Sequence, residues 1–66
     1  MLGTKMYTFL KVAEYLNFTK AAEALYMTQP AVSQQIKQLE EEVGAKVFIR
    51  NKNGLILTQQ GEIVLK

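Results

Sequence analysis

The sequence predicts a mainly α-helical fold of the winged helix-turn-helix class, with a three-helix core, a two-stranded β-hairpin wing and the start of a linker helix. Apolar residues recur at helical spacing in three segments before Gly44. After Gly44 the chain is rich in β-branched and aromatic residues on both sides of an Asn- and Gly-containing turn. We therefore expect one domain over residues 1–58, followed by the start of a further helix over residues 59–66.

The first helix is expected over residues 5–16, where apolar side chains at positions 6, 9, 10, 13 and 16 form one face. Thr4 carries a hydroxyl suited to capping the first turn. Asn17 interrupts the apolar pattern, and its amide oxygen suits the N-terminus of the next helix. These signals predict a helix boundary immediately before Asn17.

The second and third helices are expected over residues 19–26 and 29–43, joined by a tight turn. We expect Ala21, Ala22 and Leu25 to face inward. The two alanines allow another helix to cross closely, because little side-chain volume separates the backbones. Two helices joined in this way, the second with a polar outer side, form a helix-turn-helix.

The third helix has clear start and stop signals. Pro30 lies in its first turn, where the missing N–H costs nothing. Either Thr28 or Gln29 caps the helix, and we favour Gln29 because proline disfavours helical geometry in the residue before it. Gly44 supplies the left-handed residue that ends the helix. The apolar stripe expected in the core consists of Val32, Ile36, Leu39 and Val43.

The outward side of the third helix is small, amide-rich and weakly basic, and it carries Pro30, Ala31, Gln34, Lys37 and Gln38. Such a surface suits a DNA groove. Glutamine pairs bidentately with adenine, alanine contacts a thymine methyl, and lysine reaches guanine or phosphate. We favour Gln34 as a base reader, the alternative being a solvated side chain. For Lys37 a guanine contact, a phosphate contact and a solvated amine remain open.

A β-hairpin is expected after the third helix, with strands at residues 46–50 and 55–57 and a turn at residues 51–54. A hairpin in this place forms a wing. Its tip holds Arg50 and Lys52 within reach of the phosphates that flank a groove. The alternative for Arg50 is an exposed ion pair with a glutamate, worth about 0–1 kcal/mol.

A fourth helix is expected from residue 59, with Thr58 as its cap. Its apolar residues are Ile63, Val64 and Leu65. Because the chain stops inside this apolar pattern, we expect it to be a piece of a longer protein.

The composition argues against catalysis and metal binding. The chain has no Cys, His, Asp or Trp, so neither a zinc site nor a Ser/His/Asp or Cys/His constellation can be built. Its six acids are all glutamates, and residues 40–42 are expected to form a solvated, acidic helix end that repels phosphate. We expect no enzyme activity, no cofactor and no metal.

The net charge of +2 permits nucleic-acid binding but does not by itself indicate it. The absence of cysteine agrees with a reducing cytoplasm, where we expect the protein to be located. No apolar run approaches the ~20 residues that a membrane span requires, so we expect no membrane partner.

Several short segments occur in an order and spacing that are specific as a set. They are residues 9–14, 17–22, 29–40 and 48–50, with Leu25, Gly44, Leu57, Thr58 and Gly61. With these segments, which include Gln29-Pro30-Ala31-Val32-Ser33, nearly the whole chain resembles the N-terminal domain of LysR-type transcriptional regulators. It departs from the family at Leu16-Asn17, where Gly-Ser is usual, and at Gln34, where Arg is frequent. The second departure shifts the expected base preference from guanine towards adenine.

The resemblance implies sequence-specific binding to double-stranded promoter or operator DNA by a bacterial regulator. It also implies that residues 59–66 begin a linker or dimerisation helix, which holds a homodimer or tetramer together. A separate C-terminal domain would bind a small-molecule inducer. We expect base contacts from Gln29, Pro30, Ala31, Gln34 and Lys37. We expect contacts to the DNA backbone from Asn17, Thr19, Thr28, Ser33, Gln38, Arg50, Lys52 and Asn53. For Ser33 the alternative is a packed hydroxyl bonded to the helix backbone.

Two other classes of function can be compared with this expectation. A winged helix that binds only proteins would expose large apolar or aromatic anchors on its third helix. This helix exposes glutamine, alanine and serine instead. A small enzyme would need a set of catalytic residues that the chain lacks. The residues therefore favour recognition of double-stranded DNA.

Overall fold

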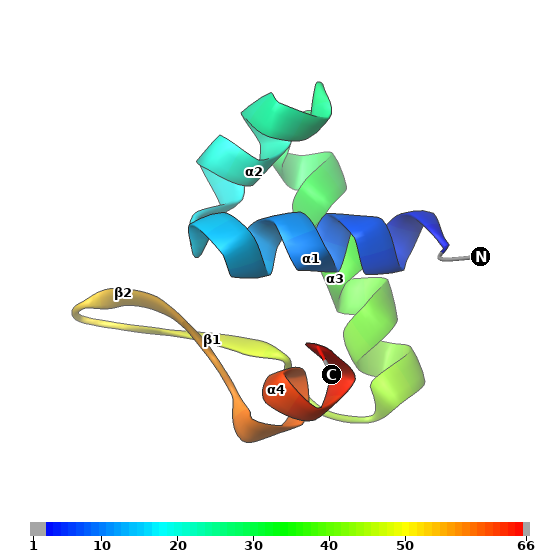
Figure 1. Ribbon diagram of the computed structural model, residues 1–66, viewed down its shortest axis with the longest axis vertical. Coiled ribbons are helices and arrows are strands. Elements are labelled where there is room, and N and C mark those ends of the chain that lie inside the picture. The colour runs from blue at the N-terminus through cyan, green and yellow to red at the C-terminus, as the bar shows by residue number, and fades with distance from the viewer. Residues whose placement is uncertain (1–2, 66) are drawn as a thin grey trace.

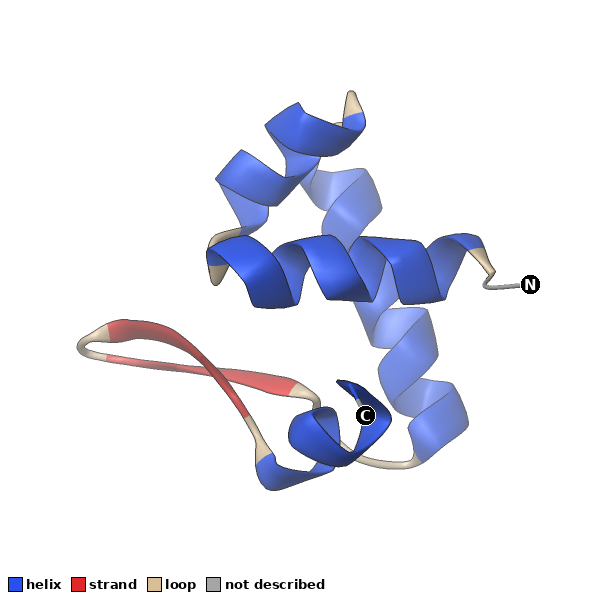
Figure 2. Ribbon diagram, in the orientation of Figure 1, coloured by secondary structure: helices blue, strands red, loops and turns tan. Residues whose placement is uncertain are grey.

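The computed structural model describes residues 3–65 and confirms the mainly α winged helix-turn-helix fold. Three helices pack together, a long hairpin extends from one side, and a last short helix lies beside the base of the hairpin (Figures 1 and 2). The elements are α1 (Thr4–Tyr15), α2 (Phe18–Leu25), α3 (Gln29–Val43), β1 (Phe48–Asn51), β2 (Gly54–Leu57) and α4 (Gln59–Leu65). None of these described helices is long and apolar enough to span a membrane.

The first helix is displaced by one residue from its predicted position. Gly3 has the extended backbone of a cap (φ −76°, ψ 167°), which places Thr4 inside the first turn, so the predicted capping role of Thr4 is wrong. Leu16 leaves the helix in the left-handed conformation (φ 48°) and is exposed, although it was predicted to belong to the apolar face. The helix ends there because Asn17 is extended, as the cap of the next helix must be.

The predicted cap of α2 is confirmed. The Asn17 Oδ1 accepts the backbone N–H of Lys20 at 2.9 Å. Tyr26, predicted as the last residue of the helix, instead ends it in the left-handed conformation (φ 57°) and is 97% exposed. The predicted inward residues are buried or half-buried against the other helices, and they are Ala21, Ala22 and Leu25.

The cap of α3 is Thr28, so the preference for Gln29 is wrong. The Thr28 hydroxyl accepts a backbone N–H of the first turn at 3.3 Å, and Gln29 is already helical. The restriction that Pro30 places on Gln29 is outweighed by the hydrogen bond that a threonine hydroxyl offers at the cap. Gly44 ends the helix in the left-handed conformation (φ 83°), as predicted.

One apolar core joins the three helices to the base of the hairpin. Its buried members are Phe9, Val12, Ala21, Ala22, Val32, Ile36, Leu39, Val47 and Phe48. The ring centroids of Phe9 and Phe48 lie 5.4 Å apart, which fixes the hairpin to α1. Val43 was predicted in the core but is 38% exposed, because it is the last residue of α3, where that helix extends beyond α1 (Figure 1).

The wing is an antiparallel hairpin in which Asn51 lies opposite Gly54. Its first strand starts two residues later than predicted, because the backbone groups of Lys46 and Val47 bond to α3 and to Thr58. Gly54 was expected in the turn but opens β2 with φ 119°, a conformation that favours glycine. Lys52 and Asn53 are left at the tip of the hairpin. The predicted positions of Arg50 at the tip and of Asn51 in the turn are wrong, because both residues pair with β2 as part of β1.

The prediction of a solvated acidic end at residues 40–42 is wrong for Glu40. Its Oε2 accepts the N–H of Val47 at 3.0 Å, and the Lys46 Nζ lies 3.8 Å from its Oε1. Val47 is fully buried, so its N–H needs an acceptor within the protein. Glu42 forms an ion pair with Lys5 of α1, whereas Glu41 has no such partner within residues 3–65.

Thr58 caps α4 and also connects that helix to the hairpin. Its hydroxyl accepts the N–H of Gly61 at 3.0 Å and donates to the carbonyl of Lys46 at 2.6 Å. Gly61 is buried at this junction. A Cβ at Gly61 would lie 2.4 Å from the carbonyl oxygen of Val47 and 2.6 Å from the Leu57 Cδ1. Only a residue without a side chain permits this close approach of α4.

We predict that Gly61→Ala lowers the free energy of unfolding by about 1–3 kcal/mol, because the added methyl must displace backbone. Replacing glycine by alanine within a helix normally raises stability by about 0.5–1 kcal/mol. A loss of stability would therefore indicate that the added methyl group clashes with the hairpin. Urea denaturation measures it. Gln60→Ala, at the exposed neighbouring position, serves as the control and should be neutral. A Gly61→Ala protein as stable as the control would contradict the packing described for α4.

Candidate nucleic-acid interface

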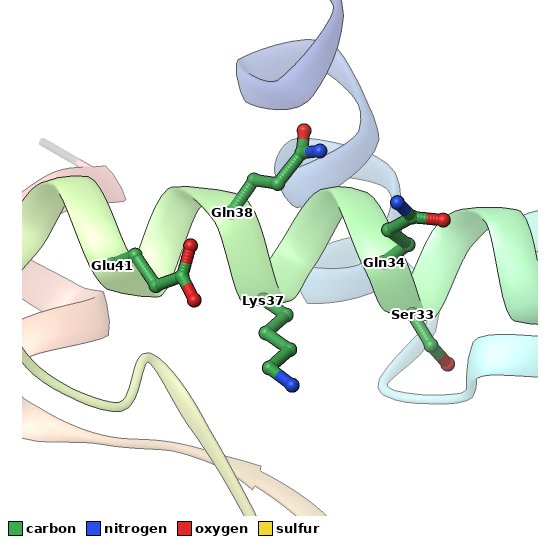
Figure 3. A pocket seen from close by; sticks show the side chains of 5 residues that line it. All are labelled: Ser33, Gln34, Lys37, Gln38 and Glu41. Carbon is green, nitrogen blue, oxygen red and sulfur yellow. The ribbon is translucent and has the colours of Figure 1, made fainter.

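The outward side of α3 is open to solvent. Five of its side chains line a shallow hollow of about 500 Å³, named here the α3 hollow: Ser33, Gln34, Lys37, Gln38 and Glu41. They spread across the near face of the helix, with Ser33 and Lys37 towards one edge of that face and Gln38 towards the other (Figure 3). The spacing of three and four residues places all five on one helical face. The predicted polar outer side therefore exists as a continuous surface.

Gln34 and Lys37 are exposed in the middle of this surface. Within residues 3–65, neither side chain has a hydrogen-bond or ion-pair partner. Because the amide and the ammonium group are exposed and have no partner, they can bond to another molecule without first breaking a hydrogen bond within the protein.

The first turn of α3 is more tightly packed. The Gln29 Nε2 donates to the Ser33 Oγ at 3.3 Å, and both residues are half-buried. Ser33 is thus bonded to a side chain of the preceding turn, which differs from the alternative in which it bonds to the helix backbone. Pro30 is exposed and Ala31 is half-buried. This turn presents small apolar surface beside one amide.

A second hollow, of about 220 Å³, lies where the hairpin meets the two helices of the helix-turn-helix. It is named here the wing hollow, and its lining residues are Leu16, Asn17, Phe18, Thr19, Gln29, Arg50, Gly54 and Leu55. Four predicted site residues from three separate segments are therefore neighbours: Asn17, Thr19, Gln29 and Arg50. The hollow joins the start of α2, the start of α3 and the wing into one surface.

Arg50 lies over an aromatic ring. Its guanidinium carbon is 5.3 Å from the ring centroid of Phe18. Among residues 3–65 Arg50 forms no ion pair with a glutamate, so that alternative is wrong. Phe18 was not predicted as a site residue. The sequence carried no signal for it: alternation along a strand places Phe48 and Arg50 on the same face of the hairpin, but it does not tell which residue covers that face.

The remaining predicted residues lie outside both hollows. Lys52 and Asn53 are exposed at the tip of the wing, and the backbone N–H of Asn53 is bonded to the Asn51 Oδ1 at 2.9 Å. Thr28 is exposed, and its oxygen already serves as the cap of α3. None of these three residues lines either hollow.

The charges on this surface are unequal along α3. Lys37 lies near the middle of the helix, whereas Glu41 closes the α3 hollow at its C-terminal end (Figure 3). An anion is thus favoured towards the N-terminal half of α3 and disfavoured beyond Lys37. No group of three or more His, Cys, Asp or Glu side chains within the described residues is arranged to hold a metal ion.

Comparison with known proteins identifies the family. Residues 4–62 match the sequence-family model described as bacterial regulatory helix-turn-helix protein, lysR family. The chain belongs to the LysR family. It is 60% identical over 57 residues to the HTH-type transcriptional regulator AlsR of Bacillus subtilis (strain 168), an alignment that covers 86% of this chain and 19% of AlsR. The chain therefore spans about a fifth of the length of the curated relatives that it matches.

Solved structures of the family share the fold. A LysR-family transcriptional regulator from Eggerthella lenta DSM 2243 is 43% identical, with a TM-score of 0.92 over 98% of this chain and 93% of that one. The CbnR_DBD chain in a crystal structure of its complex with DNA is 32% identical, with a TM-score of 0.89 over 98% of this chain and 75% of that one. Both likenesses support the identification of the elements as a LysR-type winged helix-turn-helix.

Proposed function

We propose that this chain binds double-stranded DNA sequence-specifically, as the DNA-binding domain of a bacterial LysR-type transcriptional regulator. The observation that carries the proposal is the exposed amide and lysine surface of α3. The hydrogen bond from Gln29, which lines the wing hollow, to Ser33, which lines the α3 hollow, links this surface to the wing hollow. α3 enters the major groove, which has room for one helix. The complex of CbnR_DBD with DNA, a structural neighbour, supports this reading.

In the proposed complex, the N-terminal half of α3 contacts bases. The exposed Gln34 pairs with a base edge, with adenine as the preferred partner, and Lys37 bonds to guanine or to a phosphate. Pro30 and Ala31 supply small apolar contacts, and Gln29 supplies a further amide. Glu41 repels phosphate, so the duplex lies towards the start of the helix.

The DNA backbone is held from both sides of the groove in this proposal. The wing supplies Arg50, Lys52 and Asn53, and α2 supplies Asn17 and Thr19. The edges of α3 supply Thr28, Ser33 and Gln38. Phosphate contacts of this kind provide much of the affinity and make it fall with salt.

The properties of the full-length protein belong to the same proposal. Residues 1–58 bind DNA, and residues 59–66 begin a linker helix through which two or four copies assemble. A separate C-terminal domain binds a small-molecule inducer. The proposed role is regulatory and not enzymatic, and it places the protein in the cytoplasm, where bacterial promoters are found.

Binding of labelled duplexes tests the proposal directly. We expect the chain to retain a subset of duplexes from a random pool and to bind them more weakly as salt rises from about 50 mM to about 200 mM. A winged helix that binds only proteins would retain no duplex at either salt concentration. That result would overturn the proposed function.

We predict that Gln34→Ala changes base preference at one or two positions of the selected site. The alanine variant lacks the amide that forms a bidentate contact with a base, so it should lose about 1–3 kcal/mol of discrimination between base pairs at that position. Sequencing of the duplexes retained by each variant measures the change. Gln60→Ala removes an exposed glutamine from α4 and should leave the profile unchanged. An identical profile for Gln34→Ala would remove Gln34 from the set of base contacts.

We predict that Lys52→Ala weakens binding to all duplexes alike. One phosphate contact is lost, so the slope of log K against log salt concentration becomes shallower by about 0.9. Titrations at several salt concentrations measure this slope. Lys11→Ala on α1 changes the net charge equally and is the matched control, with an unchanged slope expected. A loss confined to one sequence would assign Lys52 to base reading instead.

A further inference from the structure

The ring of Phe18 lies between the wing and the core. Its centroid is 6.2 Å from that of Phe48, in an edge-to-face arrangement with an interplanar angle of 75°. Phe48 is itself buried and packs on Phe9. Arg50 lies over Phe18 at 5.3 Å. A chain of contacts thus runs from the core of α1 through three rings to one guanidinium group on the wing.

The register of the hairpin explains why one ring contacts both residues. Phe48 and Arg50 are two positions apart on β1, opposite Leu57 and Leu55 of β2. Alternate residues of a strand point to the same face, so their side chains stand side by side. Phe18, the first residue of α2, covers that face of the strand. The hairpin is therefore in contact with the helix-turn-helix just where the cationic side chain emerges.

The contact with the ring leaves the guanidinium able to bind an anion. Its carbon lies over the ring, and none of its five N–H donors has a hydrogen-bond or ion-pair partner within residues 3–65. Arg50 is exposed and lines the wing hollow together with Asn17, Thr19 and Gln29. A free arginine side chain loses considerable rotamer freedom when it binds, and an arginine already held on a ring loses less.

We propose that Phe18 is a positioning residue for DNA binding: its ring holds the Arg50 guanidinium at the wing hollow, ready to bind a backbone phosphate. This inference rests on the proposed function and adds to it a residue that contacts no DNA. It predicts that the effect of Phe18 on affinity acts through Arg50 alone. It also predicts that the contact between Phe18 and Arg50 is formed in the free protein.

The test uses Phe18→Leu, Phe18→Tyr and Arg50→Ala, with the double variant Phe18→Leu/Arg50→Ala. The probe is a labelled random-sequence duplex of about 20 base pairs, or two turns, because a phosphate contact is independent of sequence. We expect Phe18→Leu to weaken binding about twofold to fivefold, the contribution of a cation–π contact at an exposed site. Phe18→Tyr keeps an aromatic face and should bind like the unaltered chain. In the Arg50→Ala background, Phe18→Leu should have no further effect.

A second readout does not depend on DNA. In the free protein, ring currents from Phe18 should shift the Arg50 side-chain protons upfield in the NMR spectrum, and Phe18→Leu should abolish that shift. Leu10→Ala, which removes apolar volume from a half-buried position on α1, controls for simple destabilisation and should leave the affinity unchanged at temperatures where it is folded.

The outcomes separate the two proposals. If the unaltered chain binds no duplex, the proposed function fails whatever the NMR result. The positioning role is overturned if the unaltered chain binds and the Phe18→Leu protein binds equally well. It is also overturned if the Phe18→Leu substitution weakens binding by the same factor in the presence and in the absence of Arg50. An absent ring-current shift in the free protein would overturn it as well.

Discussion

The packing of Phe48 against Phe9 is the contact on which the arrangement of the surface depends. A two-stranded hairpin is at best marginally stable by itself, because it has no further strand or sheet to pack against. Here the buried Phe48 and Val47 belong to the same core as the three helices. The wing therefore has one position relative to α3, and its cationic side chains and the polar side of that helix can contact one ligand together.

The sharp turns around α2 depend on local hydrogen bonds. Leu16 and Tyr26 both adopt the left-handed conformation, which costs a residue with a side chain roughly 1–2 kcal/mol. The N–H of each donates to a carbonyl of the helix that it ends, and Asn17 and Thr28 cap the helix that follows. These hydrogen bonds compensate for the unfavourable left-handed backbone conformation of the two residues. The connections are therefore short, and α2 and α3 cross at a fixed angle.

The distribution of charge matters more than its total. A net charge of +2 is modest, but Lys37, Arg50 and Lys52 lie on the proposed DNA-binding surface, whereas Glu40 and Glu42 are engaged elsewhere by Val47 and Lys5. Glu41 is the acid that remains on the surface of α3. The same helix is thus attractive to a polyanion over its first half and repulsive near its end, which restricts how a duplex can lie on it.

The sequence by itself determined the features that are local in origin. Periodicity gave the three helices, Asn17 and Gly44 marked helix ends, and an Asn- and Gly-containing segment gave the hairpin. The outward side of α3, with Gln34 and Lys37 exposed, also follows from helical spacing alone.

Only the tertiary structure decided features that depend on contacts distant in sequence. In the sequence Glu40 belongs to an acidic run, but in the structure its carboxylate accepts the buried N–H of Val47. Position 61 requires glycine because the hairpin lies against α4 there. Phe18 gains its contact with Arg50 because the register of the hairpin brings the two together across a separation of 32 residues. Local patterns fix which residues can form an element and which side is polar, whereas burial and through-space contacts exist only after the elements have packed.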